Sequence, residues 1–220
     1  NLSGSIDVAN GAGTIQLASR EAVAILPGVL AEPRVKLARL NASVRLKSDP
    51  VLEIRVESAA ASNADIELEA AGVYRAPNGD KGGPGWLDLT GRIARLHAPA
   101  AYRYVPLAAG KTTLDWLQHA LVAGRASDGS VRVKGDLAKF PFEGERESEF
   151  RVTARVTGAD LNVYPAALQS EKSAAAPPIW PLLTDIDGDL LFERASMTVT
   201  AQRGAAYGLR QSLDTVGAFV

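Results

Sequence analysis

The sequence predicts a mostly β protein, built on a long, curved antiparallel sheet with one short α-helix. Alternation of apolar and polar residues recurs along the chain, and one segment alone has a clear helical periodicity. A period of two with one charged face is typical of strands whose sheet is wet on one side and dry on the other. Because one helix cannot supply the crossovers of a parallel sheet, we expect antiparallel pairing.

The clearest strand pattern covers residues 51–57, where Leu52, Ile54 and Val56 alternate with charged side chains. Similar runs, several with a Gly or Ala in mid-strand, indicate a groove- or taco-like sheet that grows by repeat-like hairpins. We expect about ten or eleven strands at this spacing. The other predicted strands cover residues 5–8, 14–18, 42–47, 66–70, 86–96, 131–137, 150–157, 186–192 and 197–202.

The helix is predicted at residues 113–123. Thr112 and Asp115 have the spacing of a capping box, and Gly124 stands where a helix commonly ends in glycine. Its apolar stripe consists of Leu114, Leu117 and Leu121.

Two loop-rich segments, residues 76–85 and 165–181, interrupt the strands, but the same alternation continues beyond both. We therefore expect residues 1–220 to form one β-rich internal segment of a larger protein, with a subdivision into 1–75 and 86–202 as the alternative. The longest apolar stretch, residues 22–31, is broken by Pro27 and is far shorter than the roughly 20 residues of a membrane helix. We expect any membrane anchor to lie outside this chain.

Composition argues against several classes of function. The net charge of −1 gives no global field for nucleic acid, and the absence of cysteine removes disulfides, thiolate chemistry and cysteine-based zinc sites. The two histidines, His97 and His119, lie in no ligand-like spacing, and no Gly-x-Ser-x-Gly elbow is present. We predict no catalytic residues, no metal site and no cofactor.

Two charged clusters have alternative interpretations. An acidic run could offer oxygen ligands to calcium, but its glycine comes too early for an EF-hand, and a solvated strand face is the better interpretation. A basic run could form an outer stripe that contacts lipid headgroups, although the ordinary interpretation is a soluble face. The acidic run comprises Asp185, Asp187, Asp189 and Glu193, and the basic run Arg132, Lys134, Arg151 and Arg155.

Several short landmarks occur in a specific order, and the chain carrying them resembles the AsmA-like envelope proteins of Gram-negative bacteria, within them the YhdP type. The resemblance is strongest over residues 86–201 and rests on order and spacing rather than on one motif. The landmarks are GWLDL (85–89), YRYVPL (102–107), TLDWL (113–117), ALVAG (120–124), GDL (135–137), FPF (140–142), WP (180–181) and DGDLLFE (187–193).

This resemblance implies a sheet curled into a groove, anchored in the inner membrane and crossing the periplasm. We accordingly expect a non-enzymatic, periplasmic segment that binds or conducts phospholipid between inner and outer membranes and so supports the outer-membrane barrier. Its partners would be acyl chains. The alternative is a scaffold that assists outer-membrane protein assembly and binds envelope proteins through its sheet edges.

The expected site is an apolar strip on the dry face, which can hold an acyl chain at roughly 25 cal/mol per Å² without a specific polar contact. The large aromatics around the helix are expected to close one end or edge of the sheet, or to gate the groove mouth. The groove candidates are Leu87, Leu89, Ile93, Val131, Val133, Leu137, Phe150, Val152 and Val156; the groove-end or lid candidates are Trp116, Leu117, Phe140, Phe142 and Trp180.

Overall fold

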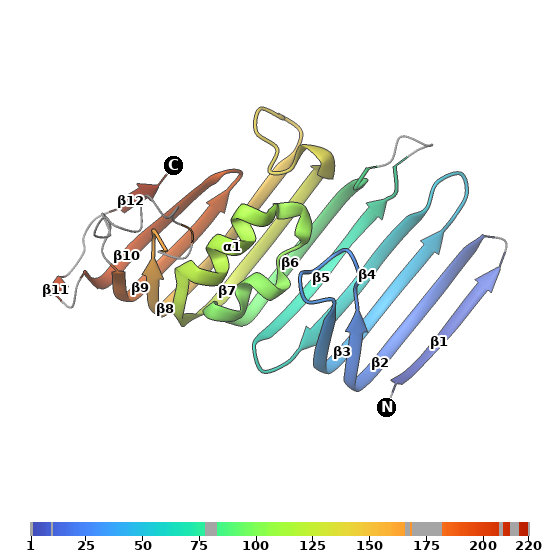
Figure 1. Ribbon diagram of the computed structural model, residues 1–220. Coiled ribbons are helices and arrows are strands. Elements are labelled where there is room, and N and C mark those ends of the chain that lie inside the picture. Colours follow the sequence, from blue (N-terminus) through green and yellow to red (C-terminus); the bar gives the residue numbers. More distant parts are fainter. Residues whose placement is uncertain are drawn as a thin grey trace.

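The computed structural model describes residues 2–9, 11–77, 83–165, 168, 182–206, 209–211 and 216–219. Within these residues the strands form one antiparallel sheet of 12 strands, which follow one another in chain order from β1 to β11, while β12 pairs with β10. Figure 1 shows a long, twisted sheet with its helices on one face. The predicted fold class is confirmed.

The strands are longer than their alternation indicated. Residues 14–18 predicted only the beginning of β2, which continues to Ile25. The bounds are β1 Leu2–Ala9, β2 Ala12–Ile25, β3 Arg34–Lys47, β4 Glu53–Ser62, β5 Ile66–Arg75, β6 Trp86–His97, β7 Leu121–Asp136, β8 Glu149–Asn162, β9 Leu182–Glu193, β10 Ser196–Ala206, β11 Leu209–Gln211 and β12 Val216–Phe219.

Strand pairing aligns the apolar positions into continuous rows that cross the sheet. Partners in an antiparallel pair share a face, so each row lies on one side of the sheet. One row consists of Ile6, Ile15, Val44, Val56, Gly72, Leu89, Val133 and Phe150. The next consists of Gly4, Leu17, Ala42, Ala59, Ala70, Gly91, Val131, Val152, Phe192 and Met197.

Irregularities in β6 and β7 change which side chains share the apolar face near one end of the strands. The pairing shifts between Glu67 and Leu68 on β5 and between Ser127 and Ser130 on β7, where Asp128 has a φ of 50°. A bulge reverses the alternation beyond it. The apolar face therefore continues there as Ile66, Leu96, Ala126 and Val156.

The opposite face carries ion pairs between neighbouring strands. The basic residues predicted as a stripe are mostly neutralised: Arg132 pairs with Asp88, Arg151 lies 3.5 Å from Glu193, and Arg155 lies 3.9 Å from Asp189. Exposed pairs of this kind contribute about 0–1 kcal/mol each. These contacts favour the ordinary interpretation of the run, a solvated face, over a positively charged outer stripe, because sheet pairing brings carboxylates beside these cations.

The connection between β6 and β7 contains two 3₁₀ helices, η1 (Ala98–Tyr104) and η2 (Leu107–Ala109), followed by the helix α1 (Lys111–Ala120). The predicted end signals were wrong. Gly110 occupies the N-cap without a side-chain cap, and Lys111 instead pairs with Asp115. Gly124 belongs to β7, where its φ of 110° and the close approach of Ala159 allow no side chain without a clash.

The hairpin of β2 and β3 reaches across the sheet. Its tip, residues 26–33, passes the two strands that separate β3 from β6 and meets the segment after η1. Leu30 forms a β-bridge with Pro106, and the Leu107 amide donates to the Val29 carbonyl at 2.8 Å. The tip, η1, η2 and α1 all lie at the end of the strands where β6 finishes and β7 begins (Figure 1).

Candidate functional site: an open apolar face

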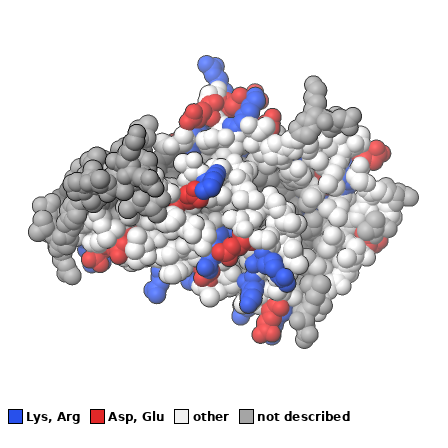
Figure 2. Space-filling view, in the orientation of Figure 1, with Lys and Arg blue, Asp and Glu red and all other residues white. Residues whose placement is uncertain are grey.

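The apolar face is the candidate site because no second sheet covers it in the described part of the chain. Its residues in β2 to β10 are mostly only partly buried, and on β1 the side chain of Ile6 is 70% exposed. Figure 2 shows that most of the face bearing the helix is uncharged, with charged side chains along its edges and in a few groups nearer its middle. A broad apolar surface left open to solvent is typical of a binding surface.

The register places the predicted groove residues on this face, with one exception. Leu137 lies outside the sheet because β7 ends at Asp136, whose carboxylate accepts a hydrogen bond from the Ala138 amide at 3.0 Å and starts the 3₁₀ helix η3 (Leu137–Lys139). The other residues share the face: Leu87, Leu89, Ile93, Val131, Val133, Phe150, Val152 and Val156. Their contact with lipid stays a prediction.

Sequence reasoning did not assign the half of the face that β1 to β5 provide. Ile15, Val44 and Val56 continue the row of Leu89 and Val133 without a polar interruption. The alternation of residues 51–57 already contained this signal, since it placed Val56 on a dry face. What the sequence alone could not supply was the register that joins Val56 to Leu89 through Gly72.

The helix closes the face on one side. Leu117 and Ala120 are buried, and Ala120 forms a core cluster with Leu161 of β8 and Ile186 of β9. Trp116 packs against this cluster, and its indole Nε1 donates to the Val163 carbonyl at 3.1 Å. The indole is therefore anchored at its polar end, as is usual for a partly buried tryptophan.

The phenylalanines lie at the other end of β7, not beside the helix. The Phe140 ring is 5.6 Å from that of Phe142 and 4.7 Å from that of Phe150. Phe142 is fully buried, and its ring fits against Gly135, where a Cβ would come within 2.8 Å of it. The groove-end candidates thus form two separate groups, and Trp180 lies outside the described residues.

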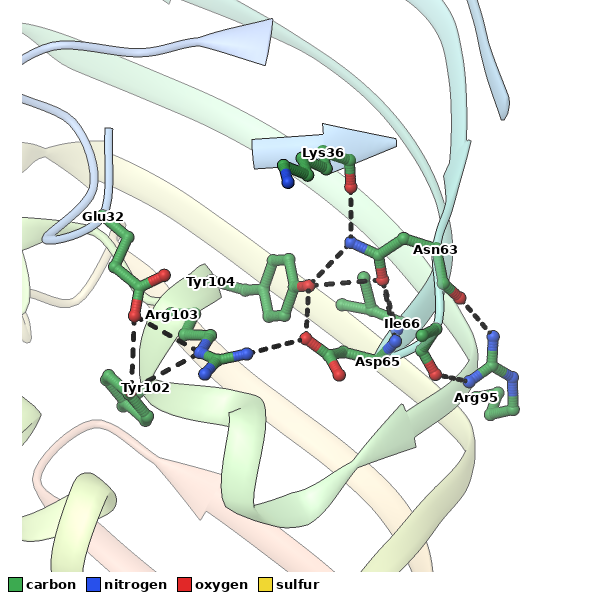
Figure 3. Close-up of polar contacts among 10 residues, drawn as sticks. Glu32, Lys36, Asn63, Asp65, Ile66, Arg95, Tyr102, Arg103 and Tyr104 are labelled. Atoms are coloured by element: carbon green, nitrogen blue, oxygen red, sulfur yellow. Dashed lines mark hydrogen bonds and ion pairs between the residues drawn. The ribbon is translucent and has the colours of Figure 1, made fainter. Parts of the chain in front are cut away.

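A polar network fastens the hairpin tip to η1 around the turn between β4 and β5 (Figure 3). Arg103 joins Glu32 of the tip, at 3.3 Å, to Asp65 of the turn, at 3.1 Å. The Tyr104 hydroxyl lies within hydrogen-bonding distance of Asn63 and of the Asp65 carboxylate. We call these five residues the clasp. It links three segments that bound the apolar face at this end of the strands.

Burial raises the pKa of Tyr104, and the neighbouring Asp65 carboxylate adds to the shift because it opposes a second negative charge. The pKa of Arg103 is also raised, chiefly by its hydrogen bond to the Tyr102 hydroxyl. The clasp therefore holds a neutral phenol and a charged guanidinium at neutral pH.

The acidic run is a solvated strand face held by pairing rather than a calcium site. Asp187 lies 2.6 Å from Arg203 and accepts a hydrogen bond from the Gly158 amide at 2.8 Å. Asp189 and Glu193 form the ion pairs already described with β8. No group of three or more potential metal ligands occurs among the described residues. His119 is exposed, and its Nδ1 lies 2.7 Å from the Asp115 carbonyl oxygen.

The arrangement defines a class of protein: an open, one-sided antiparallel sheet with a continuous apolar face and a short helical cover. The family model described as YhdP protein matches residues 1–213, so the chain belongs to the YhdP protein family. No curated protein and no solved structure matches the chain significantly. None of the helices in the described residues combines the length and apolarity needed to cross a membrane.

Proposed function

We propose that this chain is a non-enzymatic segment of a periplasmic envelope protein, and that its apolar face binds phospholipid acyl chains and guides them between the two membranes. The observation that carries the proposal is the pair of unbroken apolar rows, which cross the sheet from β1 to β8 and, in one row, to β10. The rows run perpendicular to the strands. They therefore follow the long axis of the sheet, along which a lipid would have to move.

The composition of the rows suits an acyl chain better than a specific ligand. They contain aliphatic residues, glycines, two phenylalanines and a methionine, with polar side chains absent, so the rows offer no polar partner to a headgroup. Burying apolar area gives about 25 cal/mol per Å² regardless of position. A chain can then shift from strand to strand without losing a directional contact, which is what transport along a groove requires.

The helix and the clasp give this surface a boundary on one side. Trp116 and Leu117 of α1 cover the strand ends of β8 and β9, while the hairpin tip and η1 are fastened beside them. On the other side Phe140 and Phe142 close the end of β7. Acyl chains would then lie between these two covers, on the helix-bearing face that Figure 2 shows to be mostly uncharged.

The experiment uses neighbouring positions with opposite orientations. A photoreactive amino acid is placed at Val131, on the apolar face, or at Arg132, on the charged face, and the protein is irradiated in the cell envelope. The proposal expects phospholipid adducts at Val131 and few at Arg132. Equal labelling at both positions, or none at either, would contradict it.

The scaffold alternative makes a different prediction in the same experiment. A protein that acted only through its sheet edges would give protein adducts at the outer strand β1, for example at Asp7, and no lipid adducts at Val131. Mass spectrometry of the adducts separates the two outcomes directly.

A further inference from the structure

A cavity of about 460 Å³ lies at one end of β6 and β7, and its lining includes three basic side chains. It is bounded by Ala64 of the turn between β4 and β5, by Arg95 and His97 of β6, and by Arg125 of β7. It belongs to the charged side of the sheet, because the bulges in β6 and β7 turn Leu96 and Ala126 towards the apolar face. It is therefore separate from the proposed acyl-chain surface.

The three basic side chains converge because of strand pairing. His97 and Arg125 are direct cross-strand partners, and Arg95 is two residues from His97 on the same strand and the same face. Because Arg95 pairs with Ser127, Arg125 lies diagonally across from Arg95 on the same face, and neighbouring like charges destabilise a sheet when no anion lies between them. Their convergence here is the first observation that favours an anionic ligand.

Two backbone carbonyls hold the Arg95 guanidinium in place. Its Nη1 donates to the Ala64 carbonyl at 2.5 Å and its Nη2 to the Asn63 carbonyl at 2.6 Å. Asn63 is itself a residue of the clasp, and Figure 3 shows its side chain hydrogen-bonded to the Tyr104 hydroxyl. The guanidinium is therefore positioned by the backbone, and it forms no ion pair within the described part of the chain.

The cavity differs from the rest of the charged face in its pairing. Arg132, Arg151 and Arg155 each have a carboxylate partner, whereas no ion pair is found for Arg95, His97 or Arg125 among the described residues. Two carboxylates are near. Asp65 is engaged by Arg103 and Tyr104, and Glu67 is the cross-strand neighbour of Arg95 on its other side.

We propose that this cavity binds a phosphate group. A guanidinium offers paired N–H donors that match phosphate oxygens, and a second arginine beside an imidazole completes the concave, basic surface. The phosphate can belong to a phospholipid headgroup or be a free phosphate ester. The proposal does not depend on lipid binding by the apolar face, because the two surfaces lie on opposite sides of the sheet.

The test is an NMR titration of this 220-residue chain with inorganic phosphate and with glycerol 3-phosphate, read at the His97 imidazole and the Arg125 side chain. The proposal expects saturable shifts at both. Arg125→Gln, at an exposed position where folding is not at risk, should weaken the binding about tenfold, as expected for the loss of one charge-assisted hydrogen bond. His97→Gln is the second variant. Arg151→Gln, which changes the same charge elsewhere on this face, should leave the titration unchanged.

Vesicle flotation then identifies the source of the phosphate. If the chain floats with phosphatidylglycerol vesicles but Arg125→Gln does not, the ligand is a headgroup. If neither floats while the small phosphates still shift His97, it is a free ester. Absence of any shift at His97 and Arg125, or an equal affinity in Arg125→Gln and the unchanged chain, would overturn the proposal.

Discussion

At the scale of single residues, Gly135 shows how a backbone position determines where a side chain can lie. Its φ of 147° ends the regular course of β7, and the missing side chain leaves the space that the Phe142 ring occupies. Phe142 is in turn held by its carbonyl, which accepts a hydrogen bond from the Arg194 guanidinium. One glycine therefore permits the largest fully buried side chain found among the described residues.

Gly135→Ala should destabilise the protein by about 2 kcal/mol or more, since it adds a steric clash to backbone strain. Gly144→Ala is the control: Gly144 lies in the connection that follows β7, at a φ of 76°, and nothing lies within 4 Å of its missing side chain. It should cost only about 1 kcal/mol, the strain of the left-handed conformation. Urea unfolding of both variants measures the difference, and equal losses would show that the close approach of Phe142 and Ser148 to Gly135 has no energetic role.

The raised pKa of Tyr104 predicts that the folded protein loses stability at alkaline pH. Its pKa is raised above the usual 10.0 in the folded protein, so the folded state holds the phenol proton more tightly than the unfolded chain. The stabilising contribution is fully present below the unfolded pKa and disappears as pH rises through the folded pKa.

Absorbance titration of tyrosinate tests this assignment. The chain has five tyrosines, and the tyrosinate signal that is lost in Tyr104→Phe should titrate above pH 10. The stability of Tyr104→Phe should also fall less steeply than that of the unchanged chain over the same alkaline range. A difference spectrum that titrates at or below the usual tyrosine pKa would contradict the burial argument.

At the scale of elements, the clasp converts three separate turns into one boundary of the apolar face. The hairpin tip has few buried side chains of its own, with Leu26 40% and Val29 47% exposed, and Leu30 is the buried exception. Its position therefore depends on Arg103 and on the bridge to Pro106. The sequence did not reveal this contact, because Glu32 and Asp65 belong to no motif and lie far from Arg103 in the chain.

Arg103→Gln should loosen the tip without unfolding the sheet. The expected loss is about 0.5–1 kcal/mol, because the guanidinium and its partners are partly exposed to solvent. Hydrogen exchange should accelerate at the Leu107 amide, which donates to the tip, while the amides of β7 keep their protection. Arg151→Gln removes a comparable exposed pair and should leave the Leu107 amide unchanged. Unaltered exchange at Leu107 in Arg103→Gln would mean that the clasp does not hold the tip.

The helix illustrates why element ends are harder to predict than elements. Its existence and apolar stripe followed from Leu114 and Leu117, both of which are buried. Its ends did not, because Gly124 serves strand pairing with Ala159 rather than helix termination, and the helix stops where Leu121 pairs with Leu161. Tertiary pairing outweighed the local capping signal.

At the scale of the whole molecule, alternation sufficed to predict a one-sided antiparallel sheet, since residues such as Val131 and Val133 have a fixed orientation relative to Arg132. It could not predict how far the apolar face extends. That depends on the register of every neighbouring pair, and one residue of slip would exchange the two faces. The separation of the aromatic residues into two groups was also beyond prediction. The long strand β7 lies between Trp116, which precedes it, and Phe140, which follows it, and so places them at opposite ends of that strand.

The most direct test of the central claim is mass spectrometry of organic extracts from the purified chain and from a variant with Val133→Asp and Val152→Asp. Both changes put a charge into the apolar rows. The control carries Arg132→Asp and Arg151→Asp on the opposite face, and circular dichroism establishes that each variant is folded. The account predicts stoichiometric phospholipid with the unchanged chain and the control, and its loss from the Val133/Val152 variant. A folded chain free of phospholipid, or one whose lipid survives both aspartates, would contradict it.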